Sequence, residues 1–175
     1  MLSGKELSAE GDAAVGYMAE AWRGFGAAIA GLSGTLAGLL FVAVSLKSDV
    51  LAGSLTLRSR AAQTLVLFMT SALVGIVLAA PQPAAALGPE LLVIAGVTGA
   101  LLFVLDRRAG HDLENRVGRY LDMASPNLIT AALVAVGSLT YIVDTGGGLY
   151  WMIPAVVAGL VGGVINAWLF LVRVR

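Results

Sequence analysis

Two short stretches of this sequence have the form of protease active-site motifs, and the first contains a serine. Residues 31–34 read Gly-Leu-Ser-Gly, the form of a nucleophile turn that intramembrane serine proteases also use. A nucleophilic serine needs a base within hydrogen-bond reach. The only histidine, His111, falls in a predicted loop, whereas Ser33 falls near the middle of a predicted membrane helix. We therefore interpret Ser33 as a polar residue at a tight contact between helices.

The second stretch, residues 144–146, reads Asp-Thr-Gly, the form of an aspartyl-protease motif. That chemistry needs two carboxylates that share a proton, and no second acid falls inside a predicted membrane segment. His111 with Asp112 and Glu114 suggests half of a metal site, but a loop of arginines and acids is more often a solvated surface. Cysteine is absent, which excludes thiolate ligands and nucleophiles. The sequence therefore predicts no catalytic, cofactor-binding or metal-binding residue, and we expect a protein that is not an enzyme.

The elements that would carry these motifs are membrane helices. Of the 175 residues, 58% are hydrophobic and 13% are charged, whereas a soluble domain is about half apolar and a quarter charged. The apolar residues form long blocks, which indicate membrane spans. Net charge is zero, so no basic field favours nucleic acid as a partner. The partner that the composition predicts is the lipid bilayer.

The predicted fold class is all-α, an integral membrane helical bundle with five transmembrane helices. A bilayer core of about 30 Å needs about 20 helical residues, and the third and fourth apolar segments are short by this measure. Pro89 stands at the predicted start of the third helix, where proline is tolerated. A partly amphipathic tail, residues 1–21, precedes a single membrane domain, residues 22–172, and a short tail, residues 173–175, follows it. The predicted spans are residues 22–46, 61–80, 87–105, 126–143 and 149–172.

The basic residues predict how these helices are oriented. Nine of the eleven fall in residues 47–60, 106–126 and 173–175, which five spans would place on one side; only Lys5 and Arg23 fall on the other. Cytoplasmic loops carry an excess of Lys and Arg. The N-terminus is therefore expected outside and the C-terminus inside, in a bacterial cytoplasmic (inner) membrane.

Two connecting segments carry separate expectations. Residues 112–124 have apolar side chains at helical spacing, which predicts a short amphipathic helix on the inner membrane surface. Residues 81–88 could form a plain outer loop or dip into the membrane interface, and both readings stay open. Aromatic residues fall near the predicted outer interface, where amphipathic rings are enriched: Tyr17, Trp22, Tyr141, Tyr150 and Trp151.

Small residues recur at helical spacing in the first and last predicted spans. No hydrophobic force drives helices together in lipid, and small residues allow backbones to approach closely. The expected packing residues are Gly26, Ala30, Gly31, Gly34, Gly38, Gly159, Gly162 and Gly163. Either the first and last spans pack on each other within one chain, or one of these faces forms a homo-oligomer. Ser33, Gln63 and Asn166 are expected to hydrogen-bond between helices.

Two stretches resemble a group of small uncharacterised bacterial membrane proteins that is frequent in actinobacteria. Residues 36–46 with 58–65 resemble the start of that group, and residues 148–172 resemble its last span. Some members carry the label "modulator of FtsH protease", so the resemblance implies a multi-span fold and suggests a membrane protease complex as a partner. Relatives often have an acidic residue where Gln63 stands and another near Arg173, and this sequence departs at both positions.

These observations lead to two functional hypotheses. The first is a non-enzymatic structural or regulatory membrane protein that acts through helix–helix association with membrane partners or with itself. The alternative is an oligomeric channel or small-solute transporter lined by the embedded Ser and Thr residues.

Overall fold

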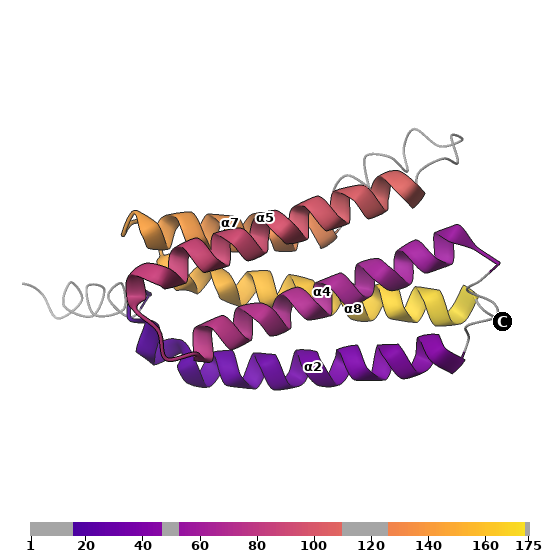
Figure 1. Ribbon diagram of the computed structural model, residues 1–175, viewed down its shortest axis with the longest axis horizontal. Helices are drawn as coiled ribbons and strands as arrows, with labels where there is room; N and C mark the ends of the chain where they lie inside the picture. The colour runs from indigo at the N-terminus through magenta and orange to yellow at the C-terminus, as the bar shows by residue number, and fades with distance from the viewer. Residues whose placement is uncertain (1–15, 47–52, 110–125, 174–175) are drawn as a thin grey trace, which may run out of the picture.

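The structure, a computed structural model, describes residues 16–46, 53–109 and 126–173. Within these ranges the chain forms an antiparallel helical bundle and no strand (Figure 1). The elements in chain order are η1 (Ala19–Trp22), α2 (Arg23–Leu46), α4 (Leu55–Ala79), α5 (Ala84–Ala109), α7 (Pro126–Ile142), η2 (Gly148–Trp151) and α8 (Met152–Arg173). The all-α prediction is confirmed. The predicted interfacial helix at 112–124 and His111 lie outside the described residues.

Four helical stretches are long and apolar enough to cross a membrane: Ala19–Leu46, Leu57–Ala79, Ala84–Arg107 and Gly148–Trp168. The stretch Leu128–Ile142 is apolar but shorter. Large apolar side chains also cover the outside of the bundle; Leu39 and Phe41, for example, are 63% and 67% exposed. Soluble monomers rarely expose apolar surface on this scale, and such faces suit contact with lipid.

Two helices are longer than their apolar cores predict. The helix expected at 87–105 is α5, which has 26 residues, because the alanines at its start are strong helix formers. Pro89 was expected at the first helical position, and that prediction is wrong: it is the sixth residue of α5. The helix expected at 61–80 begins at Leu55, where Ser54 caps it by accepting a hydrogen bond from the Leu57 amide. Charged residues in these extra turns lower the local hydropathy, so the apolar blocks in the sequence predict shorter helices than the structure has.

Helix α4 lies at the centre of the bundle and packs against α2, α5 and α8. Most of the residues that are almost fully buried between the helices are apolar: Leu67, Val74, Leu87, Leu91, Leu102, Val134, Leu149 and Met152. Ser33, Thr64, Ser71, Thr130 and Ser138 are buried to the same extent. Most buried hydroxyls are satisfied inside the protein. Ser71 and Ser138, for example, donate to the carbonyls four residues back, and Thr70 shares a 2.8 Å hydrogen bond with Thr98 of α5. The interior of the described chain is therefore mainly apolar, and most of its hydroxyls have partners within the protein.

One end of the bundle carries the aromatic side chains Tyr17, Trp22, Tyr141 and Tyr150, and we call it the aromatic end. The Gly147 amide donates to the Tyr17 hydroxyl at 3.1 Å, and the Leu149 amide donates to the Gly16 carbonyl at 2.9 Å. The Tyr17 ring stacks on the Tyr141 ring with centroids 6.2 Å apart. These contacts hold the segment before η1 against the turn between α7 and η2.

A methyl group added at Gly148 is expected to break this contact. The residue has φ 53°, and a Cβ there would lie 2.7 Å from the Gly16 carbonyl oxygen. The strain and the collision together are expected to cost Gly148→Ala about 2 kcal/mol. Thermal unfolding of the detergent-purified variants would measure the cost. Gly96→Ala, whose Cβ meets nothing within 4 Å, is the control and should be no less stable than the parent protein, because alanine is the better helix former.

Candidate helix-docking surface

Some of the expected packing glycines lie where helices touch within the chain. A Cβ on Gly26 would lie 2.6 Å from the Gly75 carbonyl oxygen, and a Cβ on Gly75 would lie 2.6 Å from the Ala30 amide nitrogen. The backbones of α2 and α4 are therefore in direct contact at this crossing. The sequence analysis did not predict Gly75 as a packing residue, because it is the only glycine in its predicted span and belongs to no repeated spacing of small residues.

The glycines of α8 also lie in close contact with neighbouring helices. A Cβ on Gly163 would lie 2.4 Å from the Phe68 ring, and a Cβ on Gly159 would lie 3.0 Å from the Ser71 hydroxyl oxygen. Gly162 is also buried. Helix α8 thus uses its small residues against α4 and, through Thr130, against α7. The expected pairing of the first and last spans is not what the structure has, because α2 packs along α4 and contacts α8 only slightly.

The remaining expected packing residues, Gly31, Gly34 and Gly38, face away from the bundle. All three are exposed, and a Cβ on any of them would meet nothing within 4 Å. They belong to a row of exposed residues on α2 whose spacing alternates between three and four. This row, the α2 stripe, consists of Gly24, Ala27, Gly31, Gly34, Gly38, Phe41 and Ser45. Such spacing keeps one helix face against a partner helix that crosses at about 20°.

The three expected polar contacts have different surroundings. Gln63 is 6% exposed and donates from Nε2 to Asp106 Oδ1 of α5 at 2.6 Å. Ser33 is fully buried, and its Oγ has no hydrogen-bond partner in the described part of the chain. Asn166 is half-buried on α8. Beside the Gln63 contact, the Ser59 hydroxyl donates to the Leu105 carbonyl at 2.9 Å, so polar groups join α4 to α5 at this level.

Asp106 is the residue that the sequence analysis missed. It follows the apolar run that was predicted as the third span, and so it was assigned to a loop. In the structure α5 continues to Ala109, which places Asp106 inside the helix and half-buried. Asp144 of the Asp-Thr-Gly stretch is instead exposed in a turn, with φ 50°. The useful signal was the amide of Gln63, since a buried amide needs a partner on a neighbouring helix.

No protein-family model, no curated protein and no solved structure matches this chain. The fold and the positions of its side chains are therefore the basis for the function proposed below.

Proposed function

We propose that this protein is a non-enzymatic, five-span inner-membrane protein whose α2 stripe docks a transmembrane helix, either of a second copy or of another membrane protein. The observation that carries the proposal is the stripe itself. It is a heptad row in which every residue except Phe41 is small, on a helix whose extensive contact among the described elements is with α4. A Cβ on any glycine of the row would meet nothing within 4 Å.

The comparison between glycines within this chain supports the proposal. Gly26, Gly75 and Gly163 all stand where a Cβ would collide with a neighbouring element. Glycine in a helix interior is about 1 kcal/mol less favourable than alanine, and close approach of two helices in lipid is what offsets that cost. Gly31 and Gly34 have no such contact among the described residues, which supports a role in binding an approaching helix.

Charge distribution supports the proposed orientation. The end where α4 begins and α5 ends, the arginine end, carries Arg58, Arg60 and Arg107. The acids Glu20, Glu90 and Asp144 belong to elements at the aromatic end. Cytoplasmic flanks are rich in basic residues, so we place the arginine end in the cytoplasm and the N-terminus outside.

The length of α7 is compatible with a fifth span. Its 17 residues extend about 25 Å at 1.5 Å per residue, against a hydrocarbon core of about 30 Å. Helices at the short end of the range are accommodated by sitting upright or by local thinning of the bilayer. An odd number of spans also keeps the arginine-rich connections on one side of the membrane.

The alternative, an oligomeric channel or small-solute transporter, gains less support. Its motivation is the set of embedded hydroxyls, but those of Thr64, Ser71 and Ser138 are bonded to carbonyls of their own helices. Leu, Val and Met make up most of the largest fully buried side chains, which also include Thr64, Thr130 and Ser33. A polar path through a single chain would need hydroxyls that remain free for a solute.

Cysteine scanning tests the stripe directly, because the chain has no cysteine of its own. Single variants Ala27→Cys, Gly34→Cys and Gly38→Cys would be oxidised in native membranes. If a second copy docks there, each should give a disulfide-linked dimer. The controls are Leu32→Cys and Leu39→Cys, which are as exposed but lie off the stripe and should give far less dimer.

A bulky residue on the stripe is expected to abolish the same complex. Gly34→Leu should lower the association constant at least tenfold, a loss of about 1.4 kcal/mol, without lowering thermal stability, since the Cβ position is open. Gly96→Leu is the matched control, because Gly96 is an equally open glycine on α5. In-cell crosslinking with mass spectrometry would identify the complex. A single partner protein lost only in Gly34→Leu would assign the stripe to that partner; an unchanged set of crosslinks would refute the proposal.

A further inference from the structure

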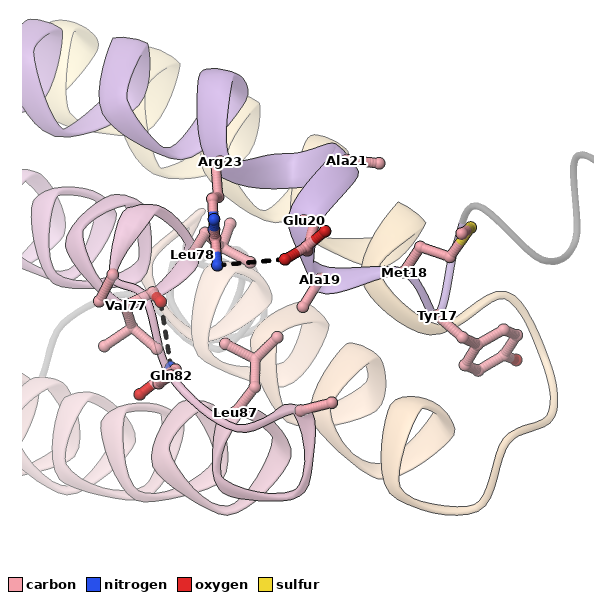
Figure 2. Close-up of a pocket in the computed structure, with 12 residues that line it drawn as sticks. Tyr17, Met18, Ala19, Glu20, Ala21, Arg23, Val77, Leu78, Gln82 and Leu87 are labelled. Carbon is pink, nitrogen blue, oxygen red and sulfur yellow. Dashed lines mark hydrogen bonds and ion pairs between the residues drawn. The ribbon is translucent and has the colours of Figure 1, made fainter.

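A cavity of about 360 Å³ lies at the aromatic end, between η1 and the turn that joins α4 to α5 (Figure 2). Its volume is in the range of small-ligand sites. Val77, Leu78 and Leu87 supply an apolar wall, and Leu78 and Leu87 are almost completely buried. Glu20 and Arg23 stand at the η1 side, and Figure 2 shows their side chains directed toward each other. The cavity is therefore amphipathic, with two opposite charges beside an apolar surface.

The two charged groups are only loosely engaged with each other. Arg23 Nη2 lies 3.5 Å from Glu20 Oε1, and the side chains are 44% and 84% exposed. A strong charge-assisted hydrogen bond is about 2.7–2.9 Å long, and exposed ion pairs contribute little to stability. Both groups can therefore engage a ligand without giving up a strong contact. Gln82 is held differently, since its Nε2 donates to the Val77 carbonyl at 3.1 Å and closes the turn beside the cavity.

The position of the cavity limits what could reach it. Aromatic rings such as Tyr17 and Trp22 are typical of the membrane–water interface, where phospholipid head groups lie. Among the described residues at this end Arg23 is the only basic one, while Glu20, Glu90 and Asp144 are acidic. A head group with only negative charge would meet Arg23 but also Glu20, a like charge that lines the same cavity. A head group that adds an amine to its phosphate would complement both sides of the Glu20–Arg23 pair.

We propose that this cavity binds a phospholipid whose head group carries a phosphate and a protonated amine. Arg23 binds the phosphate, Glu20 accepts hydrogen bonds from the amine, and the start of the acyl chains lies against Val77 and Ala84. The inference does not rest on the α2 stripe, because no residue that lines the cavity belongs to the stripe. It assigns the aromatic end a lipid ligand, a property that helix association alone does not imply.

The test uses full-length protein in detergent and one introduced cysteine. Ala84 lines the cavity, whereas its exposed neighbour Ala85 does not. Maleimide labelling of Ala84→Cys would be timed with dihexanoyl-phosphatidylethanolamine, with dihexanoyl-phosphatidylglycerol and with free O-phosphoethanolamine. The amine-bearing lipid should slow labelling about fivefold at a concentration about four times its Kd. Ala85→Cys should label at an unchanged rate, which controls for effects on the micelle.

A second substitution, added to Ala84→Cys, tests which charged residue binds which part of the head group. Adding Arg23→Gln should remove protection, adding Glu20→Gln should abolish the preference for the amine-bearing lipid, and adding Arg58→Gln at the opposite end should change nothing. Monodisperse elution of each variant verifies the fold. Equal protection by phosphatidylglycerol would refute the role of the amine, equal protection by O-phosphoethanolamine would refute a lipid source, and protection that survives Arg23→Gln would refute the site.

Discussion

Replacing Gly75 with leucine is expected to separate α2 from α4 and to destabilise the bundle by about 3 kcal/mol or more. The new Cβ would lie 2.6 Å from both the Gly26 carbonyl oxygen and the Ala30 amide nitrogen. Both are backbone atoms of a regular helix, so neither can move away by a side-chain rotation. The remaining response is to shift α2 as a whole, which opens gaps along its only extensive contact within the chain.

Fluorescence-detected size exclusion after heating would measure this effect as a fall in the temperature at which half of the protein stays monodisperse. Gly96→Leu provides the matched control, because it makes the same substitution in a long helix where a Cβ meets nothing within 4 Å. A Gly75→Leu protein as stable as Gly96→Leu would show that α2 and α4 are not in backbone contact. Gly75→Ala should fall between the parent and Gly75→Leu, since the collision already involves the first side-chain carbon.

Gln63→Leu should also destabilise the protein strongly, with a loss of about 2 kcal/mol. The variant removes the 2.6 Å hydrogen bond to Asp106 and leaves a half-buried carboxylate with one donor fewer. Desolvated carboxylates depend on such donors, and hydrogen bonds to charged groups are stronger than those between neutral groups. The same unfolding assay would measure the loss, and Leu65, an exposed residue of α4, offers Leu65→Ala as a control with little expected effect.

A double-mutant cycle then assigns that loss to the pair. Because two apolar partners leave no unpaired carboxylate behind, Gln63→Leu combined with Asp106→Leu should recover a substantial part of the stability that either substitution loses alone. Strictly additive losses would mean that the two residues stabilise the protein separately and that their hydrogen bond contributes nothing.

The sequence predicted the helices better than it predicted their neighbours. Long apolar blocks are sufficient to locate α2, α4, α5 and α8, because a span must bury its own backbone hydrogen bonds and present apolar side chains to lipid. Boundaries were less predictable where polar residues continue a helix past its apolar core. Because Arg58 and Arg60 are charged, the first residues of α4 were predicted as a loop. Asp106 had the same effect at the end of α5.

The pairing of helices could not be predicted in the same way. Gly26 and Gly34 both fit the same spacing of small residues. In the structure Gly26 is in contact with Gly75, whereas Gly34 is exposed. A pattern identifies which faces allow close approach but not which helix approaches. The contact between Gln63 and Asp106 likewise depends on the register of α4 against α5, which no local property of either residue specifies.

The contact between residues 16–17 and residues 147–149 has a consequence for the order of biogenesis. Tyr17 and Gly147 are 130 positions apart, so the ribosome has completed most of the chain before they can meet. The α2–α4 pair can assemble as soon as residue 79 has been inserted. Residues 16–17 at the start of this pair then lack their partners until the turn at residues 147–149 has been synthesised. Ribosome-bound chains truncated before residue 147 should therefore contain a packed α2–α4 pair whose N-terminal segment remains accessible to protease, and completion of the hairpin should protect it.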